Sequence, residues 1–240
     1  MRYHRVRLHD AEDPQYRAFL SATLAVKSNQ KASRTPSALS LFGGEAETIT
    51  RDWLQTIHPL HDRRFVEYDE RVGTTLIRKY RELDAVHVHD ATHIHVYEVK
   101  ASRNPRAVGR GMRQLRETQA ILKRIIPHVR CTLVIVDTGM PTAADVAALM
   151  AGPDAPVHPP ATLATVMENH PELTLVAAAD YTADNGDLCV VMLPLVDVIA
   201  RGATLGMELH LDWDESDDDT LDEPEPPPAV TYASQDADDG

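Results

Sequence analysis

Residues 82–100, with the sequence ELDAVHVHDATHIHVYEVK, decide the fold. Residue types alternate with a period of two on both sides of the polar turn 90–92, and this period sends neighbouring side chains to opposite faces of a sheet. The stretch therefore predicts two strands, Arg81–His89 and His93–Lys100, which pair as a hairpin.

Charged side chains occupy this hairpin on faces that are otherwise apolar. Asp84 shares its face with valines of the first strand, and Glu98 and Lys100 share theirs with Ile94 and Val96 of the second. Two carboxylates and an ammonium group are costly to bury together unless they are paired or bind a metal. The pattern favours a metal-dependent hydrolytic site, and the alternative is a set of cross-strand ion pairs on a solvated face.

The order of these residues resembles the core of the PD-(D/E)XK nuclease superfamily. Asp84 matches its first acidic residue, and Glu98-Val99-Lys100 match its (D/E)-X-K element, while Leu83 stands where the family name has proline. The resemblance spans about Gly43 to Asp137. It implies an α/β fold of the restriction-endonuclease-like type, with a mixed β-sheet flanked by helices.

The resemblance also implies a mechanism, the hydrolysis of phosphodiester bonds with Mg²⁺ or Mn²⁺. Asp84 and Glu98 would bind the metal together with the carbonyl of Val99, and Lys100 would orient or deprotonate the attacking water. Relatives often supply a further glutamate from a helix before the first core strand.

Glu47 matches that further glutamate, as a metal ligand and catalytic residue, because it lies in a helix expected to begin at Ser37 or Gly43 and to end at Ile57. Glu45 is the alternative match. Glu47 could instead be a solvated carboxylate that stabilises the N-terminal end of its helix.

A long basic helix is expected after the lysine strand, from about Arg106 to Ile126. Gln114 on this helix matches a catalytic glutamine of many relatives, although Thr118 stands where they usually carry tyrosine. Eight Arg or Lys residues and one acid lie between Arg103 and Arg130. We expect four of these arginines to bind phosphates, with an ordinary solvated helix face as the alternative: Arg103, Arg106, Arg110 and Arg113.

Four histidines alternate with the apolar residues of the hairpin, at positions 87, 89, 93 and 95. The alternation places them on the faces opposite Asp84 and Glu98, and the hairpin would bring them together. Imidazoles bind zinc and similar ions, so a metal site formed by His87, His89, His93 and His95 is an alternative to the acidic site.

The remaining elements follow from local patterns. We expect helices at 14–27, Ala143–Ala151, Ala161–Asn169 and Pro194–Arg201, and strands at Phe65–Val72, Thr74–Tyr80 and Cys131–Val136. The last two strands, Leu173–Tyr181 and Leu188–Leu193, flank a hairpin turn signal at Ala183–Asp187.

Composition divides the chain of 240 residues into three parts. Residues 1–36 form an N-terminal helix and linker, 37–210 a nuclease-like domain, and 211–240 a disordered acidic tail. The net charge is −13, but residues 210–240 hold twelve acids and no Lys or Arg, which leaves 25 acids against 24 bases in 1–209. The overall acidity is therefore no argument against a polyanionic substrate.

The sequence predicts a cytoplasmic protein, because it has no signal peptide and no apolar run that could span a membrane. Cys131 and Cys189 lie in apolar runs and are expected to be buried thiols. We expect a nuclease that acts on DNA rather than RNA, with a protein partner or as a homo-oligomer. Relatives include effectors of prokaryotic antiviral defence. The alternatives are a non-catalytic nucleic-acid-binding or scaffold subunit with the same fold, and a protein-interaction module.

Overall fold

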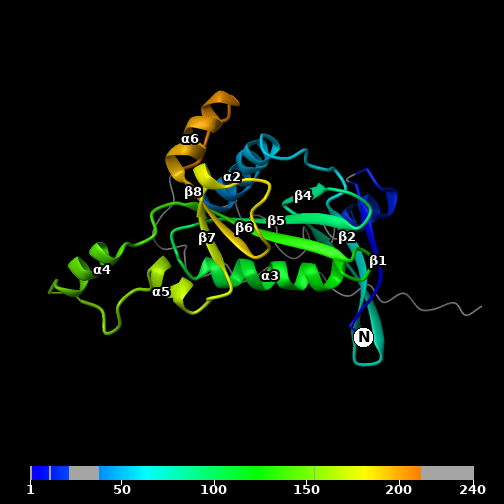
Figure 1. The fold of residues 1–240 in the computed structure, drawn as a ribbon, viewed down its shortest axis with the longest axis horizontal. Coiled ribbons are helices and arrows are strands. Elements are labelled where there is room, and N and C mark those ends of the chain that lie inside the picture. Colours follow the sequence, from blue (N-terminus) through cyan, green and yellow to red (C-terminus); the bar gives the residue numbers. More distant parts are fainter. Residues whose placement is uncertain (1, 11, 22–37, 154, 212–240) are drawn as a thin grey trace, which may run out of the picture.

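The computed structural model describes residues 2–10, 12–21, 38–153 and 155–211 (Figure 1). Residues 14–21 are helical. In chain order the other elements are β1 (Tyr3–His9), α2 (Ala38–Gln55), β2 (Phe65–Val72), β3 (Thr75–Glu82), β4 (Ala85–Val88), β5 (His93–Ser102), α3 (Ala107–Leu122), β6 (His128–Asp137), α4 (Ala143–Met150), α5 (Leu163–Glu168), β7 (Thr174–Ala177), the 3₁₀ turn η1 (Ala178–Asp180), β8 (Cys189–Pro194) and α6 (Leu195–Thr204).

The strands form two sheets. An antiparallel sheet has the order β1-β2-β3, and a mixed sheet has the order β4-β5-β6-β8-β7, in which β4 is antiparallel to β5 and the other neighbours are parallel. The chain is thus an α/β protein with sheets flanked by helices, as the sequence predicts.

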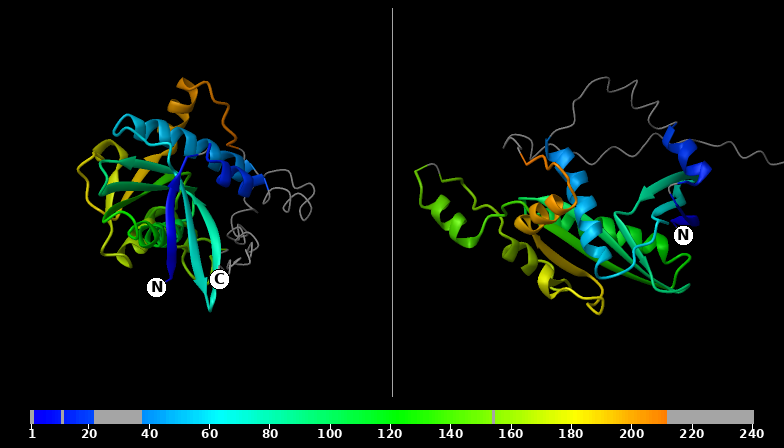
Figure 2. Two further views of the ribbon diagram at one scale, coloured as in Figure 1. Left: turned by 90° about the vertical axis from the view of Figure 1, so that its right-hand side faces the viewer. Right: turned by 90° about the horizontal axis from the view of Figure 1, so that it is seen from above.

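Helices cover both faces of the five-stranded sheet (Figures 1 and 2). α3 lies along one face, where Met112 and Leu115 join the same buried cluster as Ile94 and Val96 of β5. α2 and α6 lie on the other face, where Tyr97 and Val99 belong to the second cluster. The period of two along β5 therefore sends its even-numbered apolar residues toward α3 and its odd-numbered ones toward α2.

The boundary between the two sheets corrects one prediction. Arg81 and Glu82 belong to β3 and pair with β2, where Phe65 lies opposite Glu82, so the first hairpin strand begins only at Ala85. The alternation continues across the break at Leu83 and Asp84, and a periodic pattern alone does not show which partner strand each residue takes.

A second correction concerns β7 and β8, which are neighbours but parallel. The expected hairpin is wrong because the chain leaves the end of β7 through η1 and returns along a loop to the start of β8. Polar contacts hold that loop: Thr182 N donates to Oδ1 of Asn185, and Cys131 N donates to Oδ1 of Asp187. The turn-forming residues thus build a crossover rather than a tight reversal.

The N-terminal segment contributes a strand that the sequence reading missed. β1 pairs with β2, so residues before the expected boundary at 36 share a sheet with residues after it. Arginines at positions 2, 5 and 7 interrupt the apolar pattern of the buried Tyr3 and Val6. Two of them pair with carboxylates of β2: Arg2, directly before β1, lies 2.6 Å from Glu70, and Arg5 lies 3.6 Å from Asp69.

The other expected helices and strands are present, with ends shifted by a few residues, and Cys131 and Cys189 are buried free thiols. Residues 22–27 of the first expected helix and the acidic tail from 212 onward lie outside the described residues. No helix in the part of the chain that the structure describes is long and apolar enough to cross a bilayer.

Candidate active site at the β4–β5 hairpin

Asp84 lies directly before β4, at the open end of the β4–β5 pair. Ala85 lies opposite Tyr97, so one further step of the register sets Asp84 opposite Glu98. The Asp84 carboxylate is fixed by the neighbouring strand, because Val99 N donates a hydrogen bond of 2.6 Å to its Oδ2. The two carboxylates predicted to act together thus lie at one end of the hairpin, Asp84 directly before β4 and Glu98 within β5.

Lys100 joins this site from the same strand as Glu98. Its Nζ lies 2.7 Å from Oε1 of Glu98, and the exposed fractions of the two side chains are 30% and 14%. Residues two apart on a strand project to the same face, so the spacing of the (D/E)-X-K element places acid and base side by side.

Glu47 reaches the site from α2. Its Oε1 lies 3.4 Å from Nη1 of Arg64, and the same guanidinium donates to the carbonyl of Leu83, next to Asp84. Glu47 lies nine residues after the start of α2, so stabilisation of the helix N-terminus does not account for it. Glu45, the alternative match, binds the backbone N–H and imidazole of His210.

The carboxylates affect one another's protonation. Burial, followed by the charge of Glu98, raises the pKa of Asp84 well above its usual range, and Glu47 adds to the effect. Burial also raises the pKa of Glu47, with smaller contributions from Glu82 and Glu98, while Arg64 opposes the shift. The three carboxylates, Glu47 of α2, Asp84 directly before β4 and Glu98 of β5, therefore share a region of unfavourable negative potential.

Two arginines of this region were missed by the sequence reading. Arg51 donates from Nη1 to the carbonyl of Asp84 at 2.6 Å, and Arg64 lies 2.6 Å from Oε1 of Glu82. Arg51 follows Glu47 by four residues on α2, and this spacing places two side chains on the same helix face, so it was the available signal. Arg64 has no comparable sequence signal, because the fold brings it to the site.

Gln114 lies on the side of α3 that faces the three-stranded sheet. Nη1 of Arg81 on β3 donates to the backbone carbonyl of Gln114 at 3.2 Å and to Oγ1 of Thr118 at 2.9 Å. Glu98 contributes to the raised pKa of Arg81, after the larger effects of Glu117 and Tyr68. The contact with Arg81 is made by the backbone of Gln114, and among the described residues no hydrogen bond joins the Gln114 side chain to Asp84, Glu98 or Lys100.

The four arginines expected to bind nucleic acid lie beyond the end of β5. Arg103 is half-buried directly after the strand, and the three others are exposed at the start of α3 or along it: Arg106, Arg110 and Arg113. Arg106 directly precedes α3, and Arg110 and Arg113 lie on it, so exposed basic side chains follow the first turns of this helix.

The acidic residues have the donor chemistry that Mg²⁺ or Mn²⁺ requires, because carboxylate oxygens are their preferred ligands. A cation would also relieve the repulsion that raises the pKa of Asp84. In this arrangement the oxygens bind protein donors instead, and no three His, Cys, Asp or Glu side chains among the described residues are grouped to hold a metal ion.

The histidines are arranged differently from the expected set of four. His87 stacks on His58 with 4.7 Å between the ring centroids, and it meets His89 edge to face with 4.3 Å between the centroids. The ring centroid of His95 lies 5.7 Å from that of His58. His93 points elsewhere and stacks on a histidine of β6. The predicted zinc set is therefore not assembled in the described part of the chain.

Comparison with known proteins yields no match to a family model, to a curated protein or to a solved structure.

Proposed function

We propose that this chain is a Mg²⁺- or Mn²⁺-dependent nuclease with a restriction-endonuclease-like fold, which hydrolyses phosphodiester bonds, with DNA as the proposed substrate and RNA as the alternative. One observation carries the proposal: Asp84, fixed by Val99 N, lies beside Glu98, which is paired with Lys100. The acid, acid and lysine that the sequence pattern singles out thus meet at one end of a hairpin.

A divalent cation held by Asp84 and Glu98, with Glu47 and the Val99 carbonyl as further ligands, would polarise the phosphate and lower the pKa of a bound water. Lys100 supplies an ammonium group that donates hydrogen bonds to the attacking water or offsets charge on the phosphate. Gln114 and the arginines of α3 would hold the nucleic-acid backbone.

In this proposal nucleic acid is the substrate, and the chain also binds a protein partner or a second copy of itself. The proposed biological role, antiviral defence or DNA processing, rests on the resemblance of the sequence pattern to nucleases that act in such systems.

The test is cleavage of single-stranded DNA, double-stranded DNA and RNA, each with Mg²⁺, Mn²⁺ or EDTA. Wild type is compared with Lys100→Met and with Lys79→Met. Lys79 is a matched control, because its Nζ lies 2.6 Å from Oε2 of Glu70 and its side chain is 27% exposed, close to the 30% of Lys100. We expect metal-dependent cleavage that Lys100→Met removes and Lys79→Met preserves.

The second candidate is a non-catalytic nucleic-acid-binding subunit. Two observations favour it. Asp84 already accepts from Val99 N and Glu98 is already paired with Lys100. No three His, Cys, Asp or Glu side chains among the described residues are grouped to hold a metal ion. Tight, metal-independent binding of nucleic acid without cleavage by the wild type would select this candidate over the nuclease.

A further inference from the structure

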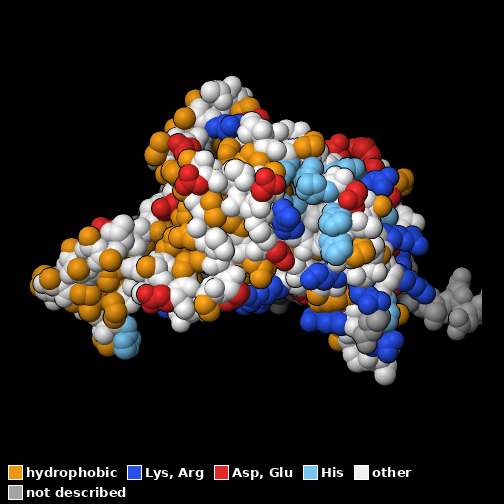
Figure 3. Space-filling view, in the orientation of Figure 1, with side chains coloured by type: hydrophobic (Ala, Val, Ile, Leu, Met, Phe, Trp, Pro, Cys, Tyr) orange, Lys and Arg blue, Asp and Glu red, His pale blue; other side chains and the backbone are white. Residues whose placement is uncertain are grey.

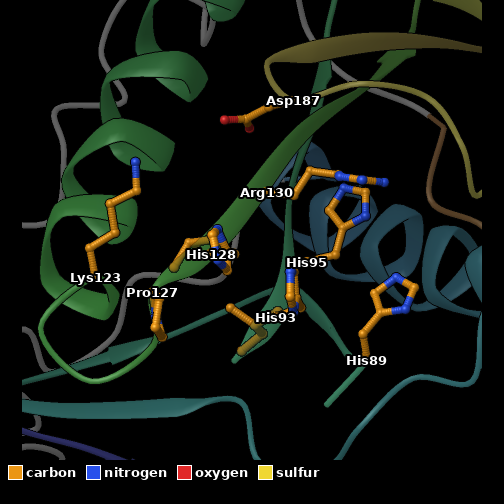
Figure 4. A pocket seen from close by; sticks show the side chains of 10 residues that line it. His89, His93, His95, Lys123, Pro127, His128, Arg130 and Asp187 are labelled. Carbon is orange, nitrogen blue, oxygen red and sulfur yellow. The ribbon is translucent and has the colours of Figure 1, made fainter. Parts of the chain in front are cut away.

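A hollow lies at the opposite end of β5 from Lys100, where β5 and β6 begin. It has a volume of about 330 Å³ and collects residues from the β4–β5 turn, the end of α3, the start of β6 and the loop before β8 (Figure 4). Its polar lining includes His89, His93, Lys123, His128, Arg130 and Asp187. In the space-filling view, histidine, lysine and arginine side chains gather on this side of the molecule (Figure 3).

Arg130 is the half-buried cation of the hollow. Its Nη1 donates to the carbonyls of Ala183 and Asn185, at 3.0 and 3.2 Å. Carbonyl acceptors fix the guanidinium but do not neutralise its charge. Among the described residues, neither Arg130 nor Lys123 forms an ion pair with a carboxylate, so no direct ion pair neutralises these two positive charges.

Asp187 is the carboxylate in the lining, and its oxygens already bind three N–H donors. Oδ1 accepts from Cys131 N at 2.7 Å and from Leu188 N at 2.9 Å, and Oδ2 accepts from Nε2 of Gln119 at 3.1 Å. These donors hold Asp187 as part of the loop wall and reduce its repulsion toward an anion.

The histidines of the hollow are arranged as hydrogen-bond donors rather than as a chelating group. The rings of His93 and His128 stack at 4.4 Å with an interplanar angle of 15°, so their nitrogen lone pairs do not converge on one point. Nδ1 of His93 also lies 3.1 Å from the carboxylate of Asp90. Burial and then neighbouring positive groups, including Arg130, lower the pKa of His89 and His95, which indicates a positive potential here.

We propose that this hollow binds a phosphoryl group, either of a free mononucleotide or at the end of a nucleic acid. Arg130 and Lys123 supply the charge, and the exposed imidazoles of His89, His93 and His128 supply further N–H donors. A volume of about 330 Å³ is near the lower limit of small-ligand pockets, which suits a phosphate ester of nucleotide size.

This site is separate from the acidic site and does not depend on the proposed cleavage. His93 and Glu98 are five residues apart on β5, which corresponds to roughly 16 Å along an extended strand. Binding can therefore be measured in EDTA, where a metal-dependent reaction is absent.

The experiment measures thermal unfolding and calorimetric binding of the full chain with inorganic phosphate, AMP and adenosine, all in EDTA. We expect phosphate and AMP to bind and to raise Tm, and adenosine to have no effect. Lys123→Gln and His128→Gln change exposed side chains, and each should weaken AMP binding by about tenfold, the usual effect of losing a hydrogen bond to a charged group.

The matched control is Arg124→Gln, which removes an exposed cation beside Lys123 that does not line the hollow. It should leave the affinity within about twofold. Equal binding of AMP and adenosine, no binding of phosphate or AMP, or equal losses in Lys123→Gln and Arg124→Gln would overturn the proposal. A 5′-phosphorylated oligonucleotide that binds more tightly than its 5′-hydroxyl form would identify the source as a nucleic-acid end, and stronger binding of AMP would identify a free nucleotide.

Discussion

Nζ of Lys100 lies 2.7 Å from Oε1 of Glu98, two residues earlier on the same strand. The Lys100 side chain is 30% exposed, and such an ion pair contributes only about 0–1 kcal/mol to stability. The pair holds a carboxylate and an ammonium group at the end of the hairpin where the half-buried Asp84 lies. Its small contribution to folding makes a chemical role testable apart from a structural one.

We expect Lys100→Met to change the free energy of unfolding by less than about 1 kcal/mol. Cleavage should nevertheless fall by at least about 10²-fold, the usual contribution of a positioned acid or base. Urea denaturation and a cleavage assay on the same preparation check both parts. A loss of activity that only parallels a loss of folded protein would contradict this prediction.

We expect Asp84→Asn to stabilise the metal-free protein at neutral pH. A carboxyl whose pKa is raised in the folded state binds more protons there than in the unfolded state, so stability decreases as pH rises above the unfolded pKa of about 3.9. Asparagine keeps an oxygen that can accept from Val99 N but carries no charge. Tm in EDTA should rise at pH 7, by about 2–4 °C for each kcal/mol gained.

The matched variant for this comparison is Glu168→Gln, which neutralises an exposed carboxylate on α5. Its Tm should equal that of the wild type. If Asp84→Asn lowers Tm in EDTA, the repulsion between Asp84 and Glu98 does not destabilise the folded state.

A divalent cation should raise the Tm of the wild type, because a ligand that binds only the folded state stabilises it by about 2.7 kcal/mol at a concentration of 100 Kd. Titration with Mg²⁺ and with Mn²⁺ should give a saturable increase that EDTA reverses. The increase should disappear in Asp84→Asn and decrease in Glu47→Gln. A response that Asp84→Asn retains in full would place the ion elsewhere.

The acidic site could be predicted because its geometry follows from short-range periodicity. The alternation along 84–100 fixes which side chains share a face, and one hairpin is enough to bring Asp84 opposite Glu98. Glu47 was recognised from its helix and from the family resemblance, and its contact with Arg64 then depends on the packing of α2 against the hairpin.

The features that could not be predicted depend on which strands become neighbours. The division between β3 and β4 lies within one continuous alternating stretch, and the parallel pairing of β7 with β8 overrides a strong turn signal. His58 reaches His87 from the loop after α2, 29 residues away in sequence. Contacts of this kind are set by the tertiary fold, and no local pattern encodes them.

The buried histidines should make the protein lose stability in acid. Burial lowers the pKa of His58 to about 4 and that of His95 to about 2, against about 6.5 in the unfolded chain. Between these values the unfolded state binds more protons, so stability decreases as pH falls below 6.5, as far as pH 4 for His58 and further for His95. His58→Phe should flatten this dependence, because Nε2 of His58 is buried without a hydrogen-bond partner among the described residues and an apolar ring can replace it. Tm measured from pH 7.5 to pH 4.5 checks the slope, with His158→Gln, an exposed histidine, as the control that keeps it. A slope that His58→Phe leaves unchanged would show that protonation of His58 does not limit stability in acid.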